Sequence, residues 1–268
     1  SCLVGSEMCI RDRNKKALTF FMMTLFILGP ISILQAQDES SYAMWESMYI
    51  TPDNTKLKAL GEAMSKHNKK YHNEGPYTAV VYNVVSGPNT GKMIWQMGPL
   101  NYSHLDSRPS DGGHDDDWRD NVMPNVKKLS HGEYWKQQDE ISNTTMLEGD
   151  NSMYPILHVR FHEINKGQSS QVKHLMQVIG KTVKAMDGVN PWGVYINEFR
   201  QGYEIGRHMA SVGFLKNWAE YDKEDTFQAT YEKLHGEGSW RSFTDAMDNT
   251  FSDSWDEIWQ YNADLSGK

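Results

Sequence analysis

The sequence predicts an α+β fold built from two copies of one β-α-β-β-α-β unit. One observation behind this prediction is internal similarity, because residues 75–107 and 190–222 share a Pro-aromatic start, a strand, a turn and a second strand. A later pair follows in the same order, since residues 118–142 and 240–266 share an opening Trp-Arg, a helical middle and a closing aromatic strand. Two copies with so long a period indicate a duplicated domain rather than a solenoid.

Hydrophobic periodicity predicts the elements of the first copy. Leu57, Leu60, Met64 and Tyr71 recur at helical spacing and share one face. The predicted order is a strand at 44–50, a helix at about 53–72, strands at 77–85 and 91–98, a helix at about 115–129 and a strand at 133–141.

The second copy repeats this order. Its first helix is indicated by apolar residues at helical spacing, which are Val172, Leu175, Met176, Ile179, Val183 and Met186. The predicted elements are a strand at 155–164, this helix, strands at 192–200 and 203–212, helical segments between 214 and 251, and a strand at 254–262.

The order β-α-β-β-α-β is that of the ferredoxin-like motif, in which two helices cover one face of a four-stranded antiparallel sheet. Two such sheets cover their bare faces by closing into a barrel. The tandem arrangement resembles the dimeric α+β barrel superfamily, which includes small cofactorless monooxygenases, haem-degrading enzymes and two-repeat chlorite dismutase-like proteins. The resemblance is topological and implies a pocket inside the barrel, but it implies no single activity. Closure within one chain or between chains, in a homo-oligomer, stays open.

Residues before 37 are expected to lie outside the fold. Residues 1–13, "SCLVGSEMCIRDR", resemble translated sequencing-adapter DNA. Residues 14–36 join a basic start to an apolar run that ends in a small residue, which predicts a secretory signal peptide. The alternative is a membrane anchor, which the helix-breaking Gly29-Pro30 disfavours. We expect a periplasmic or secreted protein, with the first repeat in 37–150 and the second in 151–268.

Charge and cysteine content limit the possible partners and the means of stabilising the fold. The chain carries 27 basic and 35 acidic residues, and since 1–36 holds four basic and two acidic ones, the remainder has a net charge of −10. Such a surface repels phosphate backbones, so nucleic acid is excluded as a partner. Both cysteines, Cys2 and Cys9, precede the expected cleavage point. The exported part therefore relies on its core rather than on disulfides.

The stretch "SDGGHDDDWRD" at 110–120 has two interpretations. Carboxylates at a helix N-terminus complement its unpaired N–H groups, so the stretch is typical of a capped helix entry, which we favour. Alternatively, Asp111, His114, Asp115 and Asp117 bind calcium or zinc, although their spacing does not match an EF-hand loop.

The strand "LHVRFHE" at 157–163 supplies the main candidate site. His158, Arg160 and His162 share one face because side chains alternate along a strand. We expect the apolar set to face the helices and the His-Arg-His set to face the barrel interior, where buried cationic groups need partners. An Arg fork between two titratable imidazoles suits an anion. Internal pairing, with Glu198, Glu204 or Glu257, is the alternative.

Strand parity adds further candidates for the pocket. These are Tyr195, Asn197 and His208 in the second copy, and Tyr82 and Trp95 in the first. For a haem, His208 or His174 would serve as the axial ligand, whereas Trp255, Trp259 and Tyr261 are typical of core packing.

Two function hypotheses remain. The first is binding of a small anionic or aromatic organic molecule in the barrel, with cofactorless monooxygenase-like chemistry. No cofactor is favoured, and haem and a divalent metal are the alternatives. The second is a non-catalytic periplasmic or secreted interaction protein with a packed barrel.

Overall fold

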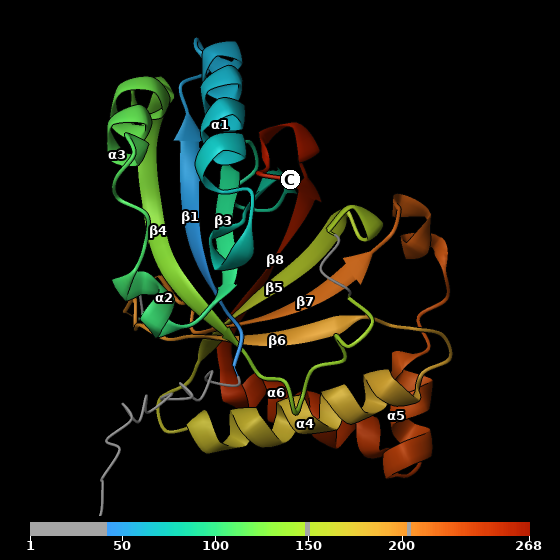
Figure 1. The fold of residues 1–268 in the computed structure, drawn as a ribbon. Helices are drawn as coiled ribbons and strands as arrows, with labels where there is room; N and C mark the ends of the chain where they lie inside the picture. The colour runs from blue at the N-terminus through green and yellow to red at the C-terminus, as the bar shows by residue number, and fades with distance from the viewer. Residues whose placement is uncertain (1–41, 148–150, 203–204) are drawn as a thin grey trace, which may run out of the picture. The chain divides into compact units, whose positions relative to one another are not determined.

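The computed structural model describes residues 42–147, 151–202 and 205–268 (Figure 1). The predictions for 1–13 and 14–36, and the proposed pairing partner Glu204, lie outside these residues. Within the described ranges, no helix combines the length and the apolar character needed to cross a bilayer.

The first half of the barrel follows the predicted order. Its helix α1 buries Leu60 and Met64, as the periodicity predicts. The predicted helix at 115–129 is instead a series of short helical turns, because Pro124 lacks the N–H that a continuing helix needs. The main elements are β1 (Met44–Pro52), α1 (Leu57–Tyr71), β2 (Ala79–Ser86), β3 (Met93–Leu100), α2 (Tyr102–Asp106), α3 (His114–Asp117) and β4 (Val126–Gln137).

The second half repeats the order, and its last two helices are longer than those of the first half. The strand predicted at 203–212 begins only at Met209, since the preceding loop turns at Gly202 and Gly206, which have φ angles of 89° and 63°. The elements are β5 (Ile156–Ile164), α4 (Ser169–Ala185), β6 (Trp192–Asn197), β7 (Met209–Leu215), α5 (Phe227–His235), α6 (Ser239–Thr250) and β8 (Phe251–Tyr261).

In the part of the chain that the structure describes, eight antiparallel strands form one closed barrel in the order β1-β3-β2-β8-β5-β7-β6-β4. Each half contributes four strands in ferredoxin-like order. The halves join at two seams, where β2 pairs with β8 and β4 pairs with β6. The predicted fold class is confirmed, and the barrel closes within one chain.

The barrel has an outer face and an inner face, and apolar core clusters lie on both. Outside, α1 packs on a core cluster with Met44, Ile50 and Trp95, and α4 to α6 pack on a second cluster around Met176 and Met209. Figure 1 shows α1 along the strands of the first half and α4 to α6 beside those of the second. Inside, a third cluster is made mainly of aromatic rings. This inner cluster surrounds the candidate site.

Candidate functional site

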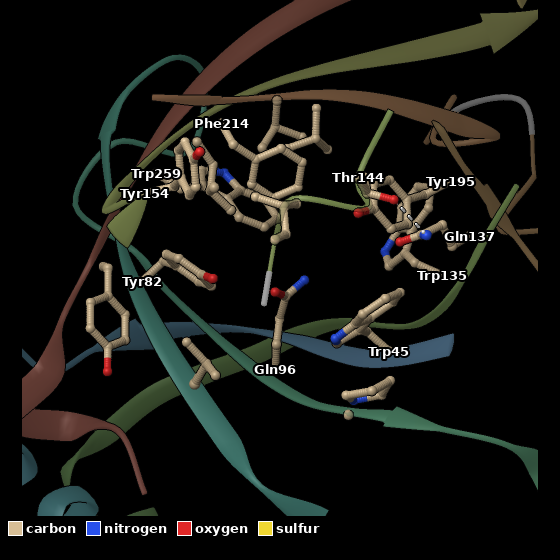
Figure 2. Close-up of a pocket in the computed structure, with 18 of the residues that line it drawn as sticks. Trp45, Tyr82, Gln96, Trp135, Gln137, Thr144, Tyr154, Tyr195, Phe214 and Trp259 are labelled. Atoms are coloured by element: carbon tan, nitrogen blue, oxygen red, sulfur yellow. Dashed lines mark hydrogen bonds between the residues drawn. The ribbon is translucent and has the colours of Figure 1, made fainter. Parts of the chain in front are cut away.

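The barrel interior contains a cavity of about 640 Å³ (Figure 2). In this view Phe214, Trp259 and Tyr154 line one side, and Trp45 and Tyr195 lie on the other. A ligand cavity of 300 to 1,000 Å³ with apolar walls and a few polar groups is typical of small-molecule sites. The volume argues against a barrel filled by its own side chains.

Strand alternation explains why rings line the cavity. On β5, Leu157, Val159 and Phe161 point inward, and on the paired strand β7 the inward set is Ala210, Val212 and Phe214. Side chains at every second position of a strand share a face, so each strand supplies between one and three of them. The cavity wall is therefore built from all eight strands and from the loop between β4 and β5.

A few polar groups interrupt the apolar wall. The Gln96 amide donates a hydrogen bond of 2.8 Å to Ser47 Oγ, and the Gln137 amide donates one of 3.1 Å to Thr144 Oγ1. Burial raises the pKa of the Tyr82 and Tyr195 hydroxyls. Both phenols therefore stay protonated at neutral pH and can donate hydrogen bonds.

A buried ion pair lies beneath the Phe161 ring. Arg207 Nε and Nη2 donate to the two carboxylate oxygens of Glu133 at 2.5 and 2.7 Å, and both side chains are almost fully buried. The guanidinium carbon lies 3.7 Å from the centre of the Phe161 ring. Burial by itself lowers the pKa of Arg207, but Tyr49 and the Glu133 hydrogen bonds raise it overall. The pair is therefore charged and links β4 to the loop before β7.

A second buried carboxylate, Glu257 of β8, lies near the first. It accepts hydrogen bonds from the Tyr49 hydroxyl at 2.8 Å, from Trp259 Nε1 at 2.8 Å and from the Asn89 amide at 2.6 Å. Burial is the main reason that the pKa of Tyr49 lies well above its usual value. Because its oxygens already accept these hydrogen bonds, Glu257 is not the partner of Arg160 that the sequence analysis considered.

The predicted orientation of the His-Arg-His set is wrong. The apolar side chains of β5 face the cavity, so His158, Arg160 and His162 face outward. The reason is that the barrel interior is itself an apolar core, and the outer face of β5 carries a polar cluster. Arg160 binds Asp256 of β8 through two hydrogen bonds of 2.7 and 2.8 Å, and His158 Nε2 lies 3.2 Å from the same carboxylate.

The Arg160→Ala variant tests this position. Its side chain is 51% exposed, and exposed ion pairs contribute about 1 kcal/mol or less. We expect urea denaturation to show a loss of unfolding free energy below about 1 kcal/mol. A loss of several kcal/mol, as for a buried charge pair, would contradict an outward Arg160.

His162 is buried on this outer face, beside Phe251. Its Nδ1 lies 2.8 Å from Ser254 Oγ and its Nε2 lies 3.3 Å from Ser211 Oγ. Burial, helped by the nearby Arg160 charge, lowers the pKa of His162 to about 4. The imidazole is therefore neutral at neutral pH and packs as part of the protein interior.

The other pocket candidates divide between the two faces. Tyr195 and Tyr82 line the cavity. Asn197 lies opposite the inward-facing Trp135 on the neighbouring strand, so it also points inward. Its side-chain amide donates to the Arg207 carbonyl at 3.1 Å. Trp95 is on the outer face, where its indole donates to Asn68, so its prediction is wrong. His208 Nδ1 accepts from the Ile164 N–H at 2.9 Å, outside the cavity wall.

The described wall does not contain either of the predicted haem ligands. It has no histidine, cysteine or methionine side chain, and of the usual axial ligand types it supplies only tyrosine. The two candidate ligands lie elsewhere, because His208 is bound at the base of β7 and His174 is exposed on α4. Trp259 and Tyr261, which were expected to be plain packing residues, are part of the wall instead.

The acidic stretch before α3 does not cap its helix through a side chain. The N-cap is Gly113, with a φ of 84°, and Asp115, Asp116 and Asp117 occupy the first turn. Asp111 contributes only its carbonyl, which accepts from the His114 N–H at 3.2 Å. Asp117 instead lies 2.8 Å from an imidazole nitrogen of α1.

His114 joins two histidines that the sequence analysis did not single out. His67 lies in α1 and His72 is the C-cap residue of that helix, and one nitrogen from each of the three lies within 4.8 Å of the others. Burial lowers the pKa of both His67 and His72, to about 4 for His72. Three imidazoles so arranged could hold a metal ion.

Comparison with known proteins rests on structure. The sequence matches no protein-family model and no sequence among the curated proteins. A "putative monooxygenase" from Lactobacillus acidophilus NCFM superposes with a TM-score of 0.51 at 9% identity, covering 82% of this chain and 94% of that one. The chain has the dimeric α+β barrel fold.

Two further structures share this fold. An anthrone oxidase-like protein gives a TM-score of 0.50 at 11% identity over 86% of this chain and 94% of that one. A "putative monooxygenase" from Fusobacterium nucleatum gives 0.51 at 7% identity over 83% and 93%. The superpositions establish the fold, but sequence identities this low carry no information about the reaction. The chemistry must therefore be argued from the residues of the cavity.

Proposed function

We propose that the protein binds a planar aromatic organic molecule in the barrel cavity. The observation that supports this most directly is the cavity itself, of about 640 Å³ and walled by aromatic rings from both halves of the chain. Offset and edge-to-face ring contacts favour a flat aromatic ligand. Gln96, Gln137 and the neutral Tyr82 and Tyr195 hydroxyls supply the polar groups that would orient it.

The wall favours an aromatic ligand over an anionic one. Among the described residues of the wall, Lys268 is the one residue with a cationic side chain, and it is exposed to solvent. The buried Arg207 is already paired with Glu133 through two hydrogen bonds. A ligand with phenol or ketone groups therefore suits the cavity better than a carboxylate or phosphate. The proposed location, in the periplasm or outside the cell, rests on residues 14–36 alone.

Oxygenation without a cofactor is the proposed chemistry for such a ligand. Support comes from fold neighbours named as monooxygenases and as anthrone oxidase-like. The described wall has no side-chain carboxylate or imidazole to act as a strong base. The substrate would therefore be one that ionises readily and itself supplies electrons to O₂, as when anthrone and O₂ give anthraquinone and water.

The Ala210→Phe variant tests the site. Ala210 lies on the cavity wall, so a phenyl group there is expected to occupy ligand space and weaken binding at least about tenfold, or about 1.4 kcal/mol. The measurement is quenching of tryptophan fluorescence by anthrone and by 1-naphthol, with O₂ uptake followed in parallel.

Ala229→Phe is the matched control, because Ala229 is exposed on α5. It should bind both probes as the unmodified protein does. The proposal fails if neither probe binds the unmodified protein, or if Ala210→Phe binds them equally well. Binding without O₂ uptake would retain the binding function and reject the oxygenation.

A further inference from the structure

The strongest site outside the barrel cavity is the cluster of His67, His72 and His114. Two of its members lie in α1 and at its C-cap, and the third begins α3. His72 Nε2 and His114 Nε2 are 3.1 Å apart, and the nitrogens that the three side chains present to one another lie within 4.8 Å. His67 and His72 are almost fully buried, and the His114 side chain is 13% exposed.

The other ring nitrogens determine which tautomer each histidine adopts. His67 Nδ1 lies 2.8 Å from Asp117 Oδ2, and His114 Nδ1 lies 2.7 Å from Asp115 Oδ1. His72 Nδ1 lies 2.9 Å from the Tyr77 carbonyl oxygen. Since carboxylate and carbonyl oxygens only accept hydrogen bonds, each Nδ1 carries the proton. In each ring Nε2 is therefore the nitrogen left to face the other two histidines.

The three Nε2 atoms converge on one position. With both rings in these tautomers, His72 Nε2 and His114 Nε2 at 3.1 Å face each other as two acceptors, a contact that a metal ion or a shared proton satisfies. His67 Nε2 is buried and has no hydrogen-bond partner, which is costly for a polar atom in a protein interior. Both observations point to the same position for an electron-pair acceptor.

We propose that His67, His72 and His114 bind one divalent transition-metal ion of the zinc type through their Nε2 atoms. Imidazole suits zinc, copper, iron and nickel, whereas calcium requires oxygen ligands. Tetrahedral zinc with Zn–N bonds of about 2.0 to 2.1 Å separates its ligand nitrogens by about 3.4 Å. The His72–His114 separation of 3.1 Å is close to that value, and the other separations, which are within 4.8 Å, would close by at most about 1.4 Å.

The surrounding groups complete a typical histidine metal site. Metal-bound histidines usually donate their second nitrogen to a carboxylate or a backbone carbonyl, and all three here do so. Among the described residues, no fourth histidine, cysteine or carboxylate joins the cluster, so the fourth coordination position is left to water or a small ligand. Asp115 and Asp117 orient the ligands, and Asp111 has no part in the site.

The ion would fasten the acidic stretch to the first helix. α3 has four residues and follows Gly112 and Gly113, both with positive φ, so its own hydrogen bonds hold it weakly. Coordination by His114 joins it to α1, in addition to the contact between Asp117 and His67. Metal binding is therefore expected to stabilise the folded chain, as a ligand of the native state does.

The test uses the full chain without a histidine tag, stripped with EDTA. Titration with Co²⁺ is expected to saturate at one ion per chain and to give the visible d–d absorption of a tetrahedral site. Zn²⁺ should displace Co²⁺ and raise the unfolding temperature. Absence of Co²⁺ and Zn²⁺ binding by this protein would overturn the proposal without any variant.

Variants locate the ion. His72→Ala should weaken Co²⁺ binding by more than about 100-fold, while Asp117→Asn, which changes only an orienting group, should weaken it by about 10- to 100-fold. His174→Ala removes an exposed histidine of α4 and serves as the matched control. Unchanged affinity in His72→Ala, or a loss of affinity in His174→Ala, would place the metal elsewhere and reject the site. Circular dichroism in EDTA checks that each variant is folded.

Discussion

Replacing Arg207 with methionine is expected to lower the free energy of unfolding by about 3 to 5 kcal/mol. The substitution leaves the Glu133 carboxylate buried without its two hydrogen-bond donors from the guanidinium. It also removes the cation that stacks on the Phe161 and Tyr49 rings. Urea denaturation followed by circular dichroism measures the loss.

The double variant Arg207→Met/Glu133→Gln is the matched control. It removes both charges but keeps a side-chain oxygen that can accept from Trp135 Nε1, which donates to Glu133 at 3.0 Å. Because a buried ion pair often contributes little relative to neutral residues of similar size, the double variant should recover much of the loss. A loss below about 1 kcal/mol in Arg207→Met alone would mean that Glu133 finds solvent, and would contradict the buried pair.

The second large effect concerns acid. Burial lowers the pKa of His162 to about 4, while an unfolded histidine titrates near 6.5. Between these two pH values the unfolded chain binds a proton that the folded chain does not, so acidification favours unfolding. We expect His162 to account for up to about 3 kcal/mol of lost stability between pH 6.5 and pH 4.

His162→Gln isolates this contribution, since other buried histidines also respond to acid. Glutamine can still hydrogen-bond to Ser254 and Ser211 but does not titrate in this range. Denaturation midpoints between pH 4 and pH 7 should therefore vary less steeply in the variant. The exposed His235→Gln is the control and should keep the slope of the unmodified protein. Equal slopes in His162→Gln and the unmodified protein would contradict a neutral, buried imidazole.

The element order was predictable because each helix or strand buries one face, and the buried apolar residues recur with the period of that element. Helix α1 and helix α4 show this, since Leu60 and Met64 in the first and Leu175 and Met176 in the second are buried where their spacing places them. Element boundaries were less accurate where backbone chemistry decides them. Pro124 and the glycines of the loop before β7 moved the ends of β4 and β7.

The inner face of β5 could not be predicted from alternation alone. Alternation separates two sets of side chains but does not say which set points inward, and a barrel strand can bury an apolar set on either side. Phe161 and its neighbours fill the interior, whereas Arg160 finds its partner in Asp256, which the sequence analysis did not name. Tyr82 and Tyr195, assigned by the same parity argument, do line the cavity.

The two polar sites depend on contacts between distant parts of the chain. Glu133 and Arg207 are 74 residues apart, and Arg207 was placed within a predicted strand rather than in a loop. His67 and His72 are five residues apart across the end of a helix, a spacing that matches no local metal motif. Only His114 and its acidic neighbours gave a local signal, and that signal was ambiguous between capping and metal binding.

Because the barrel closes within one polypeptide, the two halves of its interior need not be identical. In a barrel made of two identical subunits, every contact across the seam occurs twice and each substitution changes both copies. Here the two halves place a carboxylate at the same position, Glu133 on β4 and Glu257 on β8, yet Glu133 binds the Arg207 guanidinium and Glu257 binds the Tyr49 hydroxyl. Each half can therefore acquire its own chemistry, and the cavity remains assembled at any dilution.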